Sequence, residues 1–158
     1  MIPIALRPAR EGDREFLFAL LRDALGPHIV KTFGPWREAE QREHFFASLK
    51  LALHQIVELA GEPIGCLNVA RSAEQLKLNR VFLLPSHQGR GIGSQLVQAL
   101  AAEADASGVP VRLRVFKVNP ARHLYERLGF RVTGEIETHF LMERAPRSAS
   151  TLVEQPAR

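Results

Sequence analysis

Apolar residues along the first 144 positions follow two spacings, one typical of helices and one typical of strands. Apolar residues three or four positions apart predict amphipathic helices, because this spacing places them on one helix face. Strict alternation and short apolar runs predict strands with one or both faces buried. The helical spacing falls at 13–25, 37–49, 94–107 and 120–128. The strand patterns fall at 4–7, 55–60, 64–71, 76–84, 111–115, 130–137 and 139–144.

Glycine and proline mark the ends of several of these elements. The pair Gly26-Pro27 predicts the end of the first helix, which leaves 28–36 as a loop before the second helix. A Gly-Glu-Pro sequence at 61–63 predicts a hairpin turn between two strands. Pro85 predicts the end of the fourth strand, because proline cannot donate to a strand ladder.

The segment Gln88-Gly89-Arg90-Gly91-Ile92-Gly93 lies between the fourth strand and the third helix. Each glycine inside a helix costs about 0.8–1 kcal/mol relative to alanine, so a purely structural turn would rarely carry three. Glycines permit close approach of a ligand to backbone N–H groups, which have no partners at a helix N-terminus. Such a site suits an anion, most naturally a phosphate. The order is neither a Walker motif nor Gly-x-Gly-x-x-Gly, and a simple strand-to-helix turn is the alternative.

Length and charge narrow the possible functions. The chain has 158 residues, which suits one domain, and a formal net charge of +4. This surplus suits an anionic ligand but is too small to indicate nucleic acid. Arginines crowd the C-terminal half, either as a solvated face or as a funnel toward the glycine segment; they are Arg112, Arg114, Arg122, Arg127 and Arg131. Residues 145–158 are rich in Pro, Ser and Arg, so we expect a domain over 1–144 and a poorly ordered tail.

Cys66 is the only cysteine, and its apolar surroundings predict a buried structural thiol rather than a nucleophile. No apolar stretch is long enough to span a membrane, and the N-terminus lacks the layout of a signal peptide. We therefore expect a cytoplasmic protein without a membrane partner. No HExxH, paired-cysteine or acidic cluster is visible, so no metal is implied.

Two motifs together resemble the GCN5-related N-acetyltransferase (GNAT) family. Its acetyl-CoA signature, Gln/Arg-x-x-Gly-x-Gly/Ala, is matched in register by Gln88, Gly91 and Gly93. The second motif, at 119–130, reads Asn-Pro-Ala-Arg-His-Leu-Tyr-Glu-Arg-Leu-Gly-Phe, where the family commonly has Asn, a short helix, Leu-Tyr-Glu and Leu-Gly-Phe. With the element order, the resemblance covers about 4–144. It implies an α/β (α+β) fold, a mixed central sheet of about seven strands flanked by about four helices.

The resemblance also implies acetyl-CoA as cosubstrate and assigns residues to it. The backbone of the fourth strand would bind the pantetheine arm as an added strand; the residues are Val81, Phe82 and Leu83. The N–H groups after this strand would hold the pyrophosphate; they belong to Gln88, Gly89, Arg90, Gly91, Ile92, Gly93 and Ser94. Asn119 would contact the cofactor near its acetyl end, and Tyr125 would lie beside its sulfur.

The sequence departs from the family in two places. Many members have one more residue between the positions of Asn119 and Tyr125. Many also carry a Glu on the fourth strand as a base that acts through water, whereas the outward positions here are Lys77 and Asn79.

Tyr125 is the only tyrosine, and its role has two interpretations. Tyrosine has an ordinary pKa near 10, so it holds its proton at neutral pH and can give it to a departing thiolate. The alternative is packing in an apolar stripe with Leu124 and Leu128. The thioester carbonyl could be polarised by a strand N–H near Leu83. The base for the amine stays open; the candidates are His28, His54, His87, His139, Glu58 and Glu137, or a chain of waters.

The segment 28–36 is the other candidate for acceptor recognition, through His28, Phe33 and Trp36, with a hydrophobic clamp between two helices as the alternative. The resulting hypothesis is an N-acetyltransferase acting on a primary amine of a small molecule or peptide. The alternative is a domain that binds acetyl-CoA without turnover, as a sensor or regulator. Pairing of two copies through the closing strands is a further expectation from the family.

Overall fold

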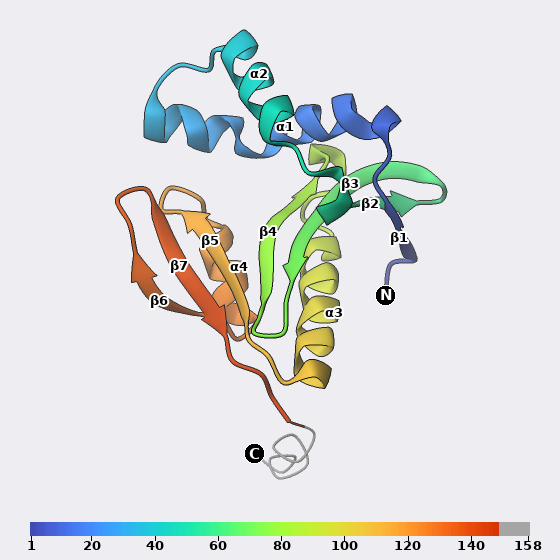
Figure 1. The fold of residues 1–158 in the computed structure, drawn as a ribbon, viewed down its shortest axis with the longest axis vertical. Helices are drawn as coiled ribbons and strands as arrows, with labels where there is room; N and C mark the ends of the chain where they lie inside the picture. The colour runs from blue at the N-terminus through green and yellow to red at the C-terminus, as the bar shows by residue number, and fades with distance from the viewer. Residues whose placement is uncertain (149–158) are drawn as a thin grey trace. The chain divides into compact units, whose positions relative to one another are not determined.

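The computed structural model describes residues 1–148, and Figure 1 traces their course. The strands are β1 (Ile4–Pro8), β2 (His54–Leu59), β3 (Glu62–Arg71), β4 (Leu76–Leu83), β5 (Val111–Phe116), β6 (Arg131–Glu135) and β7 (His139–Arg144). The α-helices are α1 (Arg14–Phe33), α2 (Glu38–Ser48), α3 (Ile92–Ser107) and α4 (Ala121–Arg127). The seven strands form one sheet with the hydrogen-bonding order β1-β2-β3-β4-β5-β7-β6. β4 and β5 are parallel, whereas the β1–β2, β2–β3, β5–β7 and β6–β7 pairs are antiparallel. The mixed sheet and four helices of the described chain confirm the predicted fold class.

The chain forms two compact units. Of the described residues, the first unit holds Met1–Val69 and Asn79–Gly93, and the second holds Ala70–Leu78 and 94–148. β4 contributes to both, because the division falls between its third and fourth residues.

Aromatic rings form the core of the first unit, where α1 and α2 lie side by side (Figure 1). The buried ring of Phe18 on α1 has its centroid 5.7 Å from those of both Phe45 and Phe46 on α2. It also lies 6.3 Å from Trp36. Burial of side chains of this size contributes about 1.5–3 kcal/mol each. Cys66 is buried in the same cluster, which confirms its prediction as a structural thiol.

Helix α1 passes through Gly26 and Pro27, so the predicted end of this helix was wrong. A proline inside a helix removes one backbone hydrogen bond and costs about 3 kcal/mol, and tertiary packing offsets this cost. Gly26 is buried, and the Trp36 ring lies 3.9 Å from the position a Cβ would take there. The helix ends at Phe33, followed by Gly34 at φ 101°, a conformation that favours glycine.

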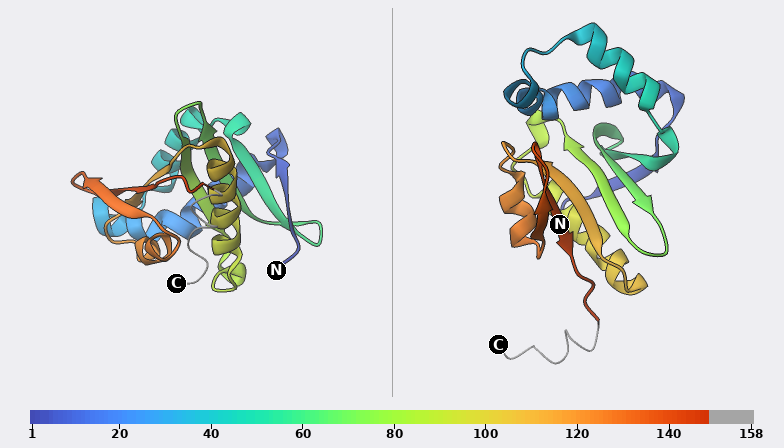
Figure 2. Two further views of the ribbon diagram at one scale, coloured as in Figure 1. Left: turned by 90° about the horizontal axis from the view of Figure 1, so that it is seen from below. Right: turned by 60° about the vertical axis from the view of Figure 1, so that its left-hand side comes forward.

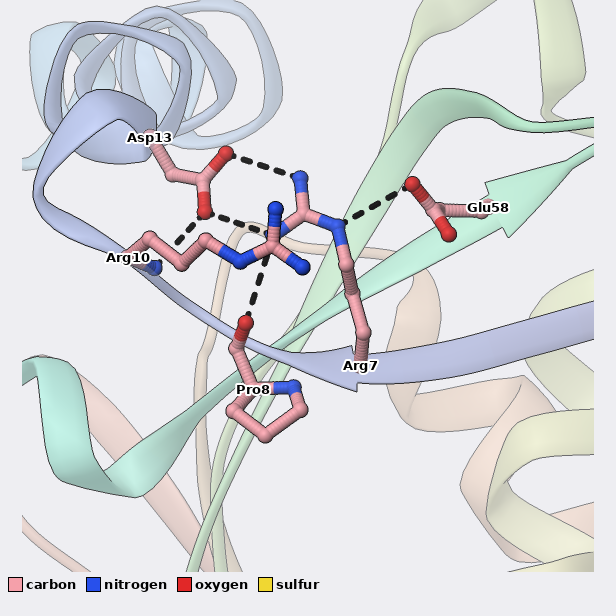
Figure 3. Close-up of polar contacts among 5 residues, drawn as sticks. All are labelled: Arg7, Pro8, Arg10, Asp13 and Glu58. Atoms are coloured by element: carbon pink, nitrogen blue, oxygen red, sulfur yellow. Dashed lines mark hydrogen bonds and ion pairs between the residues drawn. The ribbon is translucent and has the colours of Figure 1, made fainter.

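Arg7 on β1 connects three elements of the first unit (Figure 3). Its Nη1 and Nη2 donate to the two carboxylate oxygens of Asp13 at 2.8 and 2.9 Å. Its Nε donates to Oε2 of Glu58 on β2 at 3.0 Å. The hydrogen bonds from Arg7 hold the pKa of Asp13 below its ordinary value. Such a two-point arginine–carboxylate pair has a fixed geometry, and here it holds the start of α1 to β1 and β2.

In the second unit, α4 lies on one face of the sheet made by β5, β7 and β6 (Figures 1 and 2). Along β5 the side chains of Val111, Leu113 and Val115 are buried, whereas Arg112 and Arg114 are exposed. This confirms the alternation predicted for that segment.

The other predicted elements agree closely with the structure. Every strand, and every helix after the first, begins and ends within two residues of its predicted position. The predicted tail at 145–158 lies outside the described residues from 149 onward. Within residues 1–148, no helix combines the length and the apolar character needed to cross a membrane.

Candidate active site

The end of β4 presents backbone groups in the first unit. β3 approaches it so closely at Gly65 that a Cβ there would lie 2.3 Å from the carbonyl oxygen of Phe82 and 2.8 Å from the side chain of Leu83. The pairing of β4 with β5 covers only 76–78. From Asn79 to Leu83, that edge of β4 has no ladder partner within the described chain. Unpaired strand backbone of this kind can bind an extended ligand as an added strand.

The glycine loop, Gln88–Gly93, leads from β4 into α3. Gly89 and Gly91 have φ values of 73° and 82°, which glycine adopts without a steric penalty. A Cβ added at Gly89, Gly91 or Gly93 would meet no atom within 4 Å, so internal packing does not require glycine there. The backbone N–H groups of Gly89 and Gly91 have no hydrogen-bond partner in residues 1–148. The loop therefore combines open space with unpaired donors.

Gln88 connects the glycine loop to β4. Its side-chain Nε2 donates to the carbonyl oxygen of Leu83 at 3.0 Å. Its backbone N–H donates to the carbonyl oxygen of Pro85 at 3.3 Å. The N–H of Gln88 is thus already engaged, and the unpaired donors of the loop begin at Gly89.

Asn119 and Tyr125 lie at the start and in the middle of the α4 region of the second unit. The Oδ1 of Asn119 accepts a hydrogen bond at 2.9 Å from the N–H of Ala121, the first residue of α4. The helix begins at Ala121, and Pro120 directly precedes its first turn. Contact of Asn119 with the cofactor stays a prediction.

Tyr125 is 9% exposed, and its ring packs edge-on against Phe130 with centroids 5.6 Å apart. Burial raises the pKa of its hydroxyl to about 12. The ring therefore does belong to the packed face of α4, as the packing interpretation predicts. The chemical role of the hydroxyl stays a prediction.

The three residues predicted for acceptor recognition lie on or next to α1, not in a long loop. His28 and Phe33 belong to α1, and Phe33 is 66% exposed. Burial lowers the pKa of His28, and its buried Nδ1 has no hydrogen-bond partner in the described residues. Trp36 packs near Phe18 and donates from Nε1 to Glu38 at 2.8 Å. This is the hydrophobic-clamp arrangement; acceptor recognition by these residues stays a prediction.

Several candidates for the amine's base have other partners. Glu58 accepts from Arg7. The ring of His139 lies 4.2 Å from that of Phe116, and its Nδ1 lies 2.6 Å from the hydroxyl of Thr138. Glu137 is exposed. The contacts of Glu58, His139 and Glu137 therefore do not identify any of them as the base that takes a proton from the amine.

The sequence did not single out a set of linked polar side chains in the first unit, which we call the Arg80 cluster: His54, Asn68, Asn79 and Arg80. His54 and Asn68 are buried, Arg80 is half-buried and Asn79 is exposed. His54 and Asn68 are paired across β2 and β3. The Nδ1 of His54 lies 2.8 Å from the carbonyl oxygen of Lys50, so Nδ1 carries the proton and Nε2 accepts. Nε2 lies 3.1 Å from Nη1 of Arg80 and 3.3 Å from Nδ2 of Asn68.

The other contacts of the cluster involve Asn79 and the charge of Arg80. Oδ1 of Asn68 accepts from Nδ2 of Asn79 at 3.2 Å. Burial is the main reason that the pKa of His54 is lowered, and the charge of Arg80 lowers it further. His54 is therefore neutral, and its occupied Nε2 makes it a poor base for an incoming amine. Two polar residues inside apolar strands, at 54 and 68, were the available sequence signal.

The second unit carries a surface pocket of about 350 Å³ against α3 and α4. Its lining includes Asp105, Arg127 and Arg144. No predicted site residue lines it, so it is separate from the residues assigned to the cofactor.

Comparison with known proteins identifies relatives over most of the chain. The family model for the acetyltransferase (GNAT) domain matches residues 41–132, which include the glycine loop and Tyr125. An L-methionine sulfoximine/L-methionine sulfone acetyltransferase from Pseudomonas paraeruginosa is 27% identical over 146 residues, covering 84% of this chain and 83% of the relative.

Solved structures agree on the fold. PaiA N-acetyltransferase from Thermoplasma acidophilum, determined in complex with coenzyme A, superposes with a TM-score of 0.74 at 20% identity. The match covers 91% of this chain and 99% of that one. An acetyltransferase from Thermus thermophilus gives a TM-score of 0.71 at 23% identity, over 91% of this chain and 97% of that one.

Proposed function

The chain belongs to the acetyltransferase (GNAT) domain family and is an N-acetyltransferase, and we propose that it moves the acetyl group of acetyl-CoA to a primary amine of a small molecule or peptide. The glycine loop is the observation that carries this proposal. Its unpaired N–H groups precede α3, where the positive end of the helix dipole adds to their attraction for a pyrophosphate. The unpaired edge of β4 from Asn79 to Leu83 would hold the pantetheine arm beside it.

The proposed reaction is direct transfer. A neutral amine attacks the thioester carbonyl, a C–N bond forms, the C–S bond breaks, and the electron pair of that bond leaves on sulfur. The amine loses one proton and the thiolate gains one, so the products are an amide and a free thiol. A backbone N–H near Leu83 would stabilise the negative oxygen of the intermediate.

We assign Tyr125 as the group that donates a proton, or a hydrogen bond, to the leaving thiolate. A tyrosine with a pKa of about 12 stays protonated at every physiological pH. A thiol in water has a pKa near 8.5, so complete transfer from such a tyrosine to a solvated thiolate would be uphill. Burial, however, raises the pKa of a thiol as well: that of buried Cys66 is about 12. A desolvated CoA thiolate would be similarly basic, and the two groups would then be matched.

The amine must be deprotonated when it attacks the thioester carbonyl. A primary alkylamine has a pKa of about 10.4, so roughly one molecule in a thousand is neutral near pH 7.4. Because His54 and Glu58 have other partners, we assign the proton's removal to solvent water and to no single residue.

The test is thiol release from acetyl-CoA against pooled polyamines, amino acids, aminoglycosides and short peptides at pH 8. Wild type and Tyr125→Phe are compared, with His123→Gln, an exposed change on the same helix, as the control. We expect release in one pool, a turnover loss of about 100-fold in Tyr125→Phe, and unchanged acetyl-CoA affinity. Equal turnover of wild type and Tyr125→Phe would remove the assignment of Tyr125. If the wild-type protein did not bind acetyl-CoA, the proposal that acetyl-CoA is its cosubstrate would be wrong.

A further inference from the structure

Arg80 is an unusual cation in the first unit, because it is half-buried and no carboxylate of residues 1–148 pairs with it. The other buried or half-buried arginines of the described chain all form ion pairs; they are Arg7, Arg14, Arg122 and Arg144. Burial lowers the pKa of Arg80, although an arginine keeps its charge at neutral pH. Removing an unpaired charge from water is costly. An anion from outside the chain would offset this cost.

The surroundings of Arg80 hold its guanidinium in one orientation. Nη1 donates to Nε2 of His54 at 3.1 Å, and the guanidinium carbon lies 5.2 Å from the centroid of the Phe45 ring. His54 is itself fixed by its bond to the carbonyl oxygen of Lys50. The guanidinium is thus positioned by two residues that are both buried.

The donors that remain have the geometry that a carboxylate requires. With Nη1 directed to His54, Nε and Nη2 form one edge of the guanidinium fork, which can bind both oxygens of a carboxylate. The only buried side-chain nitrogens or oxygens without a partner in residues 1–148 belong to His28 and Arg144. The free nitrogens of half-buried Arg80 therefore reach solvent, where a ligand can approach them.

We propose that Arg80 binds the carboxylate of the acceptor, so that the acceptor of this enzyme is an amine that also carries a carboxylate, as an α-amino acid does. The inference rests on the proposed acetyl transfer and names its substrate class. Arg80 directly precedes Val81–Leu83, the backbone proposed for the pantetheine arm, and neighbouring strand residues are about 3.3 Å apart. In an α-amino acid a single carbon separates amine from carboxylate. A carboxylate on Arg80 would therefore keep the amine close to the thioester.

The phosphates of coenzyme A are the other anions that could reach an arginine. The unpaired N–H groups of the glycine loop, from Gly89 onward, are already proposed to bind these phosphates. The two sources are separable by measurement, because a phosphate partner would make coenzyme A affinity depend on Arg80, and a carboxylate partner would not.

The experiment compares L-amino acids with their primary amides, which lack the charged carboxylate, and it compares the ratio of the two across variants so that the accompanying change in amine basicity cancels. Each is tested as acceptor with wild type, Arg80→Gln, Arg80→Lys and the control Arg22→Gln. Glutamine removes the charge and keeps a polar side-chain N–H donor, whereas lysine keeps the charge without the planar fork. Arg22 also lies over an aromatic ring of the first unit, that of Phe18, but it is exposed and paired with Glu38.

We expect wild type to prefer at least one acid over its amide, and Arg80→Gln to lower kcat/KM for that acid about 50-fold, the scale of a charged hydrogen-bonded contact. The effect on amides should be less than about 3-fold, because an uncharged acceptor makes no ion pair with Arg80. Coenzyme A affinity should not change. The kcat/KM of Arg80→Lys for that acid should lie between those of wild type and Arg80→Gln, because an ammonium keeps the charge but cannot bind both carboxylate oxygens in the same way. Arg22→Gln should match wild type.

Calorimetric binding of the same acids and amides to the protein saturated with coenzyme A provides a readout that needs no turnover. If no acceptor is acetylated, the proposed reaction fails, and a carboxylate-dependent affinity that Arg80→Gln abolishes would still establish the anion site. Equal losses for acids and amides, or a loss confined to coenzyme A binding, would overturn the proposal. Circular dichroism of Arg80→Gln at the assay temperature verifies that the variant is folded.

Discussion

Arg144, at the end of β7, donates two parallel hydrogen bonds to Asp105 on α3, from Nη1 to Oδ1 at 2.9 Å and from Nη2 to Oδ2 at 3.2 Å. Arg144 is 6% exposed, and its buried Nε has no partner in the described chain. Oδ1 of Asp105 also accepts the backbone N–H of Arg147 at 2.8 Å. One carboxylate thus holds both the last strand and the segment after it to α3.

Asp105→Ala should lower the free energy of unfolding by about 3 kcal/mol, because it leaves a buried guanidinium without its counter-ion. Urea unfolding followed by circular dichroism measures the change. Asp23→Ala is the matched control, since its contact with Arg22 is 3.7 Å long and exposed; such pairs contribute about 0–1 kcal/mol. Equal effects of the two substitutions would show that the Asp105 pair has no special importance.

The same pair predicts a dependence of stability on acid. Burial raises the pKa of Asp105, but hydrogen bonds from Arg144 and from the N–H of Arg147 outweigh it, and the pKa is lower than usual. A lowered pKa in the folded state stabilises the protein above the unfolded value of about 3.9. This contribution is lost as pH falls through the folded pKa. Unfolding measured from about pH 6 to about pH 2 should therefore show a steeper loss in wild type than in Asp105→Ala; parallel curves would contradict the assignment.

Gly93→Val should weaken acetyl-CoA binding about 10-fold or more while leaving stability nearly unchanged. A Cβ added at Gly93 would meet no protein atom within 4 Å, so the bound pyrophosphate is what the valine would crowd. Gly12→Val is the control, since its added Cβ also meets nothing within 4 Å. Gly91→Val is a less clean test, because φ 82° strains any other residue. Calorimetry measures the acetyl-CoA affinity and thermal melts measure the stability, so the two effects can be separated. Unchanged acetyl-CoA affinity in Gly93→Val would contradict the assignment of this loop to the pyrophosphate.

The sequence predicted best what depends on neighbours along the chain. The glycine loop and the alternation of β5 are local patterns, and the structure has both. The end of α1 was predicted wrongly because Trp36, which lies beyond the end of that helix, packs against Gly26 and stabilises a turn that local propensity disfavours. The Arg80 cluster was missed because its side chains come from β2, β3 and β4 and meet only through strand pairing. Its chemistry is therefore a property of the tertiary structure.

Cys66 should not react with thiol reagents in the folded protein. It is buried, and burial raises its pKa to about 12, so the reactive thiolate is rare at pH 8. Labelling with a disulfide reagent should release no colour under native conditions and one equivalent in about 6 M guanidinium chloride, a concentration that unfolds most domains. Rapid native labelling would show that the cysteine is accessible and that its assignment as a structural thiol is wrong.

Tyr125 predicts a loss of stability at high pH that its phenylalanine variant should lack. Its pKa of about 12 lies above the unfolded value near 10. A raised pKa in the folded state means that the neutral hydroxyl is favoured by folding; the contribution is fully present below about pH 10 and is lost as pH rises toward about 12. A difference of this size corresponds to roughly 3 kcal/mol. Because Tyr125 is the only tyrosine, absorbance of the phenolate reports its ionisation directly. A midpoint near 10 in the folded protein would mean that the hydroxyl is solvated, and the basis for matching it to a desolvated thiolate would be lost.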